Sequence, residues 1–185
     1  MKSFISVRVL LVAALIAVGA GGAFAASDSA SHDIVLNVQE IAVIGLNDGS
    51  PITLSTSNTI VPGADPSSAG DDVNASKLLQ YTSVVQRGTT RSISVALGTT
   101  GVPSGTELTV EATSMPSAAN VGKATGEVVL SGAAGTLITG IGSTATGAGA
   151  SGVELTYRYR ITDVSAIATD DDATVTVVYT LTDAS

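Results

Sequence analysis

Few residues of this chain have the types and spacing that catalysis requires. His32 is the single histidine, and it lies in a run of small polar residues ahead of the first apolar-alternating segment. A Ser-His-Asp arrangement needs a histidine that a packed scaffold holds beside its nucleophile, whereas terminal residues are poorly held. With one histidine and no cysteine, the chain also lacks the ligands of zinc and similar metals. We therefore expect no enzymatic activity, no catalytic residues and no cofactor.

Carboxylates are the second group of residues with chemical potential. A glycoside hydrolase needs two acids about 5 to 10 Å apart in a sugar cleft, but the acids here fall mostly in turns and the chain has no Trp. Calcium prefers clustered oxygen ligands, which Asp65, Asp71, Asp72 and residues 170–172 supply in loops. None of these stretches has the EF-hand spacing. Solvated acidic turns are the leading interpretation, and a calcium site is the alternative.

The N-terminal residues have the pattern of an export signal. Lys2 and Arg8 precede an apolar run over residues 9–20, and the small-x-small sequence at 23–25 is typical of a signal peptidase site. The apolar run is shorter than the roughly 20 residues that span a bilayer. We therefore predict a cleavable signal peptide over residues 1–25, a mobile leader over 26–33 and one folded domain over 34–185.

The charge of the processed chain excludes some partners. Cleavage after residue 25 leaves six basic and sixteen acidic residues, and so a net charge of −10. A field of this sign repels nucleic acid and anionic lipid. We expect a secreted protein, extracellular or on the cell surface, that binds no nucleic acid and no membrane.

The apolar pattern predicts an all-β fold. Residues 153–162 alternate without error, and residues 173–182 repeat the alternation with Val175, Val177, Tyr179 and Leu181 on one face. Further segments with strand composition are 34–46, 52–56, 78–86, 90–97, 107–113, 127–131 and 136–141. We expect 78–86 and 90–97 to form a hairpin. Strands at this spacing predict a single β-sandwich, Greek-key or jelly-roll in type, with about eight or nine strands.

The first of these segments has a feature of its own. Ile34, Leu36 and Val38 share one face, but the apolar phase slips at Glu40, so we expect a β-bulge or a strand break there. An apolar strand behind a mobile leader can complete a neighbouring subunit's sheet. These three residues are the candidate anchors of such strand donation from residues 34–46. The alternative is that the segment pairs within its own chain.

Several phrases of the sequence resemble a group of uncharacterised secreted bacterial all-β proteins. They are residues 79–83 (LQYTS), 137–143 (LITGIGS), 146–147 (TG), 155–157 (LTY) and 178–182 (VYTLT). The resemblance implies secretion and a β fold but no activity. In architecture alone, the chain also looks like self-assembling fimbrial or filament subunits.

Taken together, these patterns favour a structural, non-catalytic extracellular protein. The leading hypothesis is a self-assembling filament or pilus subunit, or an adhesin, whose partner is another copy of the same chain. The alternative is a secreted module that binds carbohydrate or calcium.

Overall fold

The computed structural model describes residues 30–56, 62–98, 101–168 and 173–183. These residues form β-strands with no α-helix, which confirms the all-β prediction. The only helical turns among them are two short 3₁₀ segments, η1 (Pro66–Ala69) and η2 (Val164–Ala166). One compact unit runs from Val38 to Ser185, and the residues before it form a separate unit. The predicted signal peptide lies outside the described residues.

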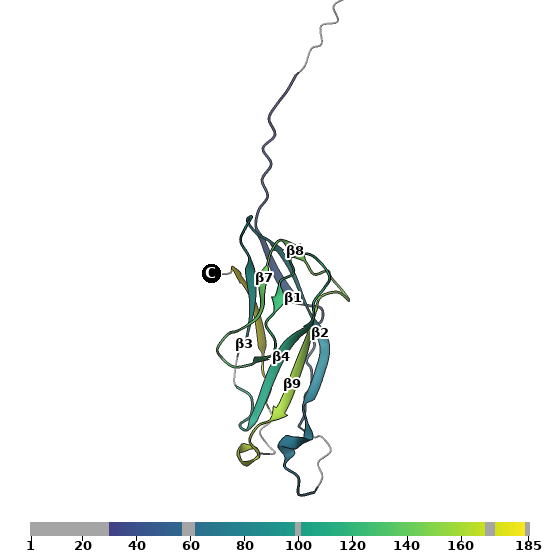
Figure 1. The fold of residues 1–185 in the computed structure, drawn as a ribbon, viewed down its shortest axis with the longest axis vertical. Coiled ribbons are helices and arrows are strands. Elements are labelled where there is room, and N and C mark those ends of the chain that lie inside the picture. Colours follow the sequence, from purple (N-terminus) through teal and green to yellow (C-terminus); the bar gives the residue numbers. More distant parts are fainter. Residues whose placement is uncertain (1–29, 57–61, 99–100, 169–172, 184–185) are drawn as a thin grey trace, which may run out of the picture. The chain divides into compact units, whose positions relative to one another are not determined.

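The larger of two antiparallel sheets contains the longest strands. Its main path is β1 (Ile41–Leu46), β2 (Asp72–Val84), β9 (Val153–Ile161), β4 (Thr106–Ser114) and β6 (Val128–Val129). A short strand, β8 (Thr144–Ala145), also pairs with β2. Figure 1 shows β2, β9 and β4 side by side.

The turn immediately before β4 requires glycine. Gly105 has a φ of +71, and a Cβ added to it would lie 2.2 Å from the carbonyl oxygen of Asp163, so no residue with a side chain fits there.

The second sheet has four strands. Their order is β10 (Val177–Asp183), β3 (Arg91–Leu97), β7 (Gly135–Ile141) and β5 (Lys123–Ala124). Alternate residues of β3 are buried, because successive side chains of a strand point to opposite faces. The described residues therefore form ten strands in two sheets, and three of the strands (β5, β6 and β8) have only two residues.

Both sheets contribute to one hydrophobic core. The larger sheet supplies β-branched, leucine and tyrosine side chains from β2, β4 and β9, and the four-stranded sheet supplies others from β3 and β7. Its fully buried members include Leu79, Ile93, Leu137, Ile138, Ile141, Leu155, Val95, Val110 and Val153. The predicted strands over 90–97, 107–113, 136–141 and 153–162 therefore exist, within a residue or two of their expected ends.

The prediction of a hairpin between residues 78–86 and 90–97 is wrong. β2 and β3 do follow one another across a turn in which the amide of Thr89 donates to the carbonyl of Gln86. They belong, however, to different sheets. Each strand has one apolar face, and the buried residues of both strands belong to the same hydrophobic core although the strands do not pair edge to edge.

The predicted strand over 34–46 forms only in its second half. β1 begins at Ile41, so the break expected near Glu40 is present. Residues 30–40 have no strand structure, and 31–40 are all exposed. Residues 52–56 also lack strand pairing, although Ile52 and Leu54 pack against the core. The first difference has a physical cause: an extended segment gains no ladder hydrogen bonds without a neighbouring strand.

Candidate functional site

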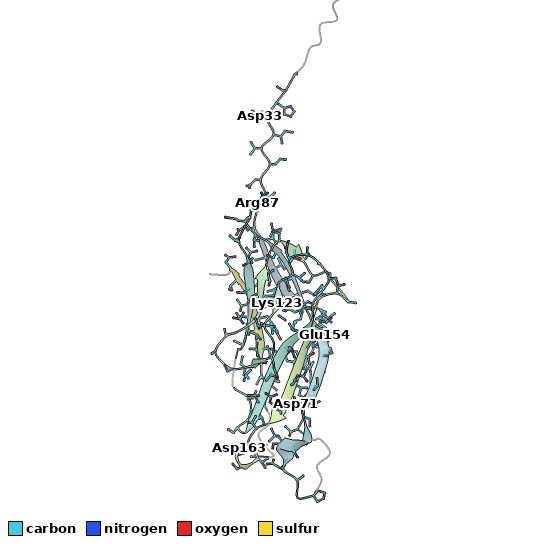
Figure 2. All side chains as sticks on the ribbon, viewed as in Figure 1. Asp33, Asp71, Arg87, Lys123, Glu154 and Asp163 are labelled. Carbon is cyan, nitrogen blue, oxygen red and sulfur yellow. The ribbon has the colours of Figure 1, made fainter. Side chains whose placement is uncertain are left out.

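The candidate anchors lie in water. Ile34, Leu36 and Val38 are 69%, 87% and 83% exposed, and Val35 between them is 93% exposed. Figure 2 shows the side chains around Asp33 projecting from an extended backbone. Neither face of this segment is therefore covered within the described chain. Residues 34–40 are not assigned to a strand, and both interpretations, strand donation and pairing within the chain, stay predictions.

One side of the domain has two long strands at the sheet edges. Among the described residues, β1 pairs only with β2, and β10 pairs only with β3. The opposite edges are β6 and β5, each of two residues. β1 and β10 also contact each other, so the two long edges lie on the same side. Unpaired strand edges of this kind are templates for another strand.

The inward-facing side chains of these edge strands are only partly covered. On β1, Ile44 lies opposite buried Tyr81 and is partly buried, while Leu46 lies opposite buried Leu79 and is 37% exposed. On β10, the side chains opposite buried Leu97, Val95 and Ile93 are those of Val177, Tyr179 and Leu181, all partly buried. We call Ile44, Leu46, Val177, Tyr179 and Leu181 the edge seam.

Arg91 ties the two edge strands together at one end of the seam. Its buried guanidinium, on β3, donates to the carbonyls of Ile41, at the start of β1, and Val84, the latter at 3.2 Å. Its Nε lies 2.9 Å from Oδ1 of Asp183, at the end of β10, and Nη2 lies 3.5 Å from Oε2 of Glu40. One cation therefore fixes the point where residue 41 enters the sheet. The sequence analysis did not single out this residue.

Two tyrosines join the sheets within the domain. The hydroxyls of Tyr157 on β9 and Tyr179 on β10 are 2.6 Å apart. Burial raises the pKa of both phenols, and the neighbouring Tyr157 raises that of Tyr179 further. Tyr157 belongs to the core, and Tyr159 and Tyr179 pack against it. These tyrosines are therefore core residues rather than a sugar-stacking surface.

The aspartates proposed as calcium ligands are used within the protein. The Asp65 side chain accepts from the amide of Ser67 and caps η1, while Asp72 accepts from the amide of Ser55 at 2.7 Å. Asp71 lies 3.8 Å from Arg160. Within the described ranges, no group of three or more potential ligands is arranged to hold a metal. Residues 170–172 lie outside those ranges, and His32 is exposed.

Charged side chains on β9 pair across to neighbouring elements. Arg160 contacts Glu107, its cross-strand partner on β4, and lies 3.3 Å from Glu127. Arg158 lies 3.9 Å from Glu111. These pairs form a cross-strand ion-pair ladder, in which both arginines of β9 have acidic partners.

A small hollow on the described surface is lined by Thr56, Pro66, Ala69, Gly70, Tyr159, Arg160 and Ile161. In the part of the chain that the structure describes, no helix has the length and hydropathy to cross a membrane.

Comparison of the chain with protein-family models, curated proteins and solved structures found no match.

Proposed function

We propose that this chain is a secreted, non-catalytic structural protein whose copies assemble into a surface filament or adhesive layer. In this proposal its two sheets form a single sandwich, and the segment around Ile34, Leu36 and Val38 is donated to a neighbouring copy. One observation supports the proposal above all others. Three apolar side chains on one face of an extended segment are exposed, and the domain of the same chain has two long strands at its sheet edges.

The energetics favour strand addition over a loose apolar contact. Burying an aliphatic side chain contributes about 1.5–3 kcal/mol, so the three anchors together supply roughly 5–9 kcal/mol. Fixing the backbone of the five residues 34–38 costs about 1–2 kcal/mol each, which is a similar total. Main-chain hydrogen bonds to an acceptor strand then decide the balance, and the alternation of side chains sets the register.

Electron microscopy and size-exclusion chromatography of the processed chain, residues 26–185, test the proposal. We expect filaments or large ordered assemblies. The variant Leu36→Asn should remove them, because it places an amide on the donated face. Val35→Asn is the matched control, since Val35 is adjacent and equally exposed but faces the other way, and it should leave assembly intact.

Two results would count against the proposal. A monomer at every concentration would contradict self-assembly and favour the ligand-binding alternative. Equal loss of assembly in both variants would show that the segment acts through general hydrophobicity rather than as a strand.

A further inference from the structure

We propose that the acceptor for the donated segment is the free edge of β10, where residues 34–38 of a second copy pair with Val177, Tyr179 and Leu181 and cover the edge seam. This inference rests on the proposed function and identifies the partner surface. It follows from three observations: the directions of the backbone groups on β10, the exposure of the seam, and the way in which residue 41 enters the domain.

The hydrogen bonds around β3 show which groups of β10 are free. The amide of Gly98 donates to the carbonyl of Thr176 at 2.8 Å, whereas the amide of Leu97 points the other way, to the carbonyl of Ser131 at 2.7 Å. Because residues of an antiparallel pair alternate between bonded and non-bonded positions, residues 176, 178, 180 and 182 face β3. The backbone groups of Val177, Tyr179 and Leu181 therefore face the open edge.

These three residues also carry the apolar side chains of the seam. Their side chains point toward the core and are only partly covered, while their amides and carbonyls point outward. A strand added at this edge forms hydrogen bonds with the backbones of the same three residues whose partly exposed side chains it covers. The spacing matches the donor, since Ile34, Leu36 and Val38 form a triplet at every second position and so do the three acceptors.

The β1 side of the seam has the same arrangement. The amide of Asn47 donates to the carbonyl of Leu78 at 2.9 Å, so the odd-numbered residues of β1 face β2 and the even-numbered ones face the open edge. Ile44 and Leu46 therefore combine outward backbone groups with inward, partly exposed side chains. In the proposed complex, an apolar strand paired with β10 also contacts the side chains of Ile44 and Leu46 on β1.

The chain's path at Arg91 favours a donor from another copy. Arg91 contacts both Ile41 and Asp183, so β1 starts beside the end of β10. For its own residues 34–38 to lie along β10, the chain would have to reverse over Gln39 and Glu40 alone. Two-residue reversals need positive φ and favour glycine and asparagine, and neither residue is of that kind.

Disulfide trapping tests the acceptor, because the chain has no cysteine of its own. Chains with Leu36→Cys are mixed with chains with Leu181→Cys, oxidised after assembly, and digested for mass spectrometry. A third variant, Lys123→Cys on β5, is the control at the opposite edge of the same sheet (Figure 2). We expect the 36–181 link to exceed the 36–123 link by about tenfold, the ratio that a preference of about 1.4 kcal/mol gives.

The outcomes separate this inference from the proposed function. Assemblies that form without a 36–181 link, or with as much 36–123 link, would overturn the β10 acceptor and leave self-assembly standing. A link formed within single monomers of the double variant Leu36→Cys/Leu181→Cys would show that the segment covers its own seam. Absence of any assembly by the cysteine variants and the unmodified chain would overturn both.

Discussion

The hydroxyl of Tyr157 on β9 lies 2.6 Å from the hydroxyl of Tyr179 on β10. β9 is an inner strand of the larger sheet and β10 is an edge strand of the other, so this hydrogen bond crosses from one sheet to the other. It holds the edge strand in place beside the core. In our proposal, the same edge strand receives the donated segment, so the tyrosine pair fixes the acceptor before any partner arrives.

The first prediction concerns this pair. Tyr157→Phe and Tyr179→Phe should each lower the free energy of unfolding by about 1–3 kcal/mol, because each leaves a hydroxyl without its partner in a mostly buried site. The double variant should lose less than the sum of the two, since no unpaired hydroxyl remains. Urea unfolding of the four proteins measures this double-mutant cycle. Strict additivity would mean that the two hydroxyls do not stabilise one another.

The second prediction concerns alkaline pH. Burial raises the pKa of Tyr81 to about 12 and also raises the pKa values of Tyr157 and Tyr179. A folded-state pKa above the unfolded value of about 10 gives stability that is fully present below pH 10 and is lost as the pH rises toward 12. Near pH 11, the tyrosinate absorbance of the folded chain should stay well below that of the chain in urea. Equal absorbances would contradict the burial of these phenols.

The third prediction concerns Arg91. Arg91→Met should lower the free energy of unfolding by about 2–4 kcal/mol, since it removes hydrogen bonds from a buried charged group to the carbonyls of Ile41 and Val84, and hydrogen bonds to charged groups contribute on the order of 1.5–3 kcal/mol. Asp183→Asn should cost under about 1 kcal/mol, because exposed ion pairs contribute little and this carboxylate is 78% exposed. Thermal or urea unfolding compares the two variants. Equal costs would assign the stabilisation to the ion pair rather than to the carbonyls of Ile41 and Val84.

The fourth prediction concerns salt. A copy that begins at residue 26, as we propose, has a net charge of −10, so such copies repel one another, and added salt screens that repulsion. Light scattering should show faster assembly as sodium chloride rises from about 10 to 150 mM, over which the Debye length falls from about 30 to 8 Å. Calcium chloride at matched ionic strength should act no differently. A specific effect of calcium would instead support a calcium site in the acidic loops.

The sequence predicted strands best where alternation was strict and buried on one face. Residues 153–162 form β9 almost as expected, because every second side chain enters the core. The pattern could not assign β2 and β3 to different sheets, since one apolar face per strand satisfies either a hairpin or two opposed sheets. Pairing partners are long-range information, and residues 34–40 show the same limit: their alternation is that of a strand, but they pair with no strand among the residues that the structure describes.

Arg91 shows a signal that the sequence did contain. It occupies the first position of the alternation that continues through Ile93, Val95 and Leu97, so its side chain had to face inward with theirs. A charged side chain that faces the core needs an ion-pair or hydrogen-bond partner. Lys77 has the same relation to Leu79 and Tyr81 on β2, and it is paired with Asp48 at 3.0 Å. A charged residue at a core-facing position of a strand thus indicates that another segment of the chain binds its side chain there.

The unequal edges of the two sheets limit how copies can join. β5 and β6 have two residues each, too few to template a strand, whereas β1 and β10 have six and seven. In our proposal, each copy then has a single receptive side and a single donor. A contact of this kind joins two different surfaces, and it gives an open filament where the rotation between copies does not close a ring. The proposed filament then grows in single file, with a bare acceptor at one tip and an unused donor at the other, and it has a direction.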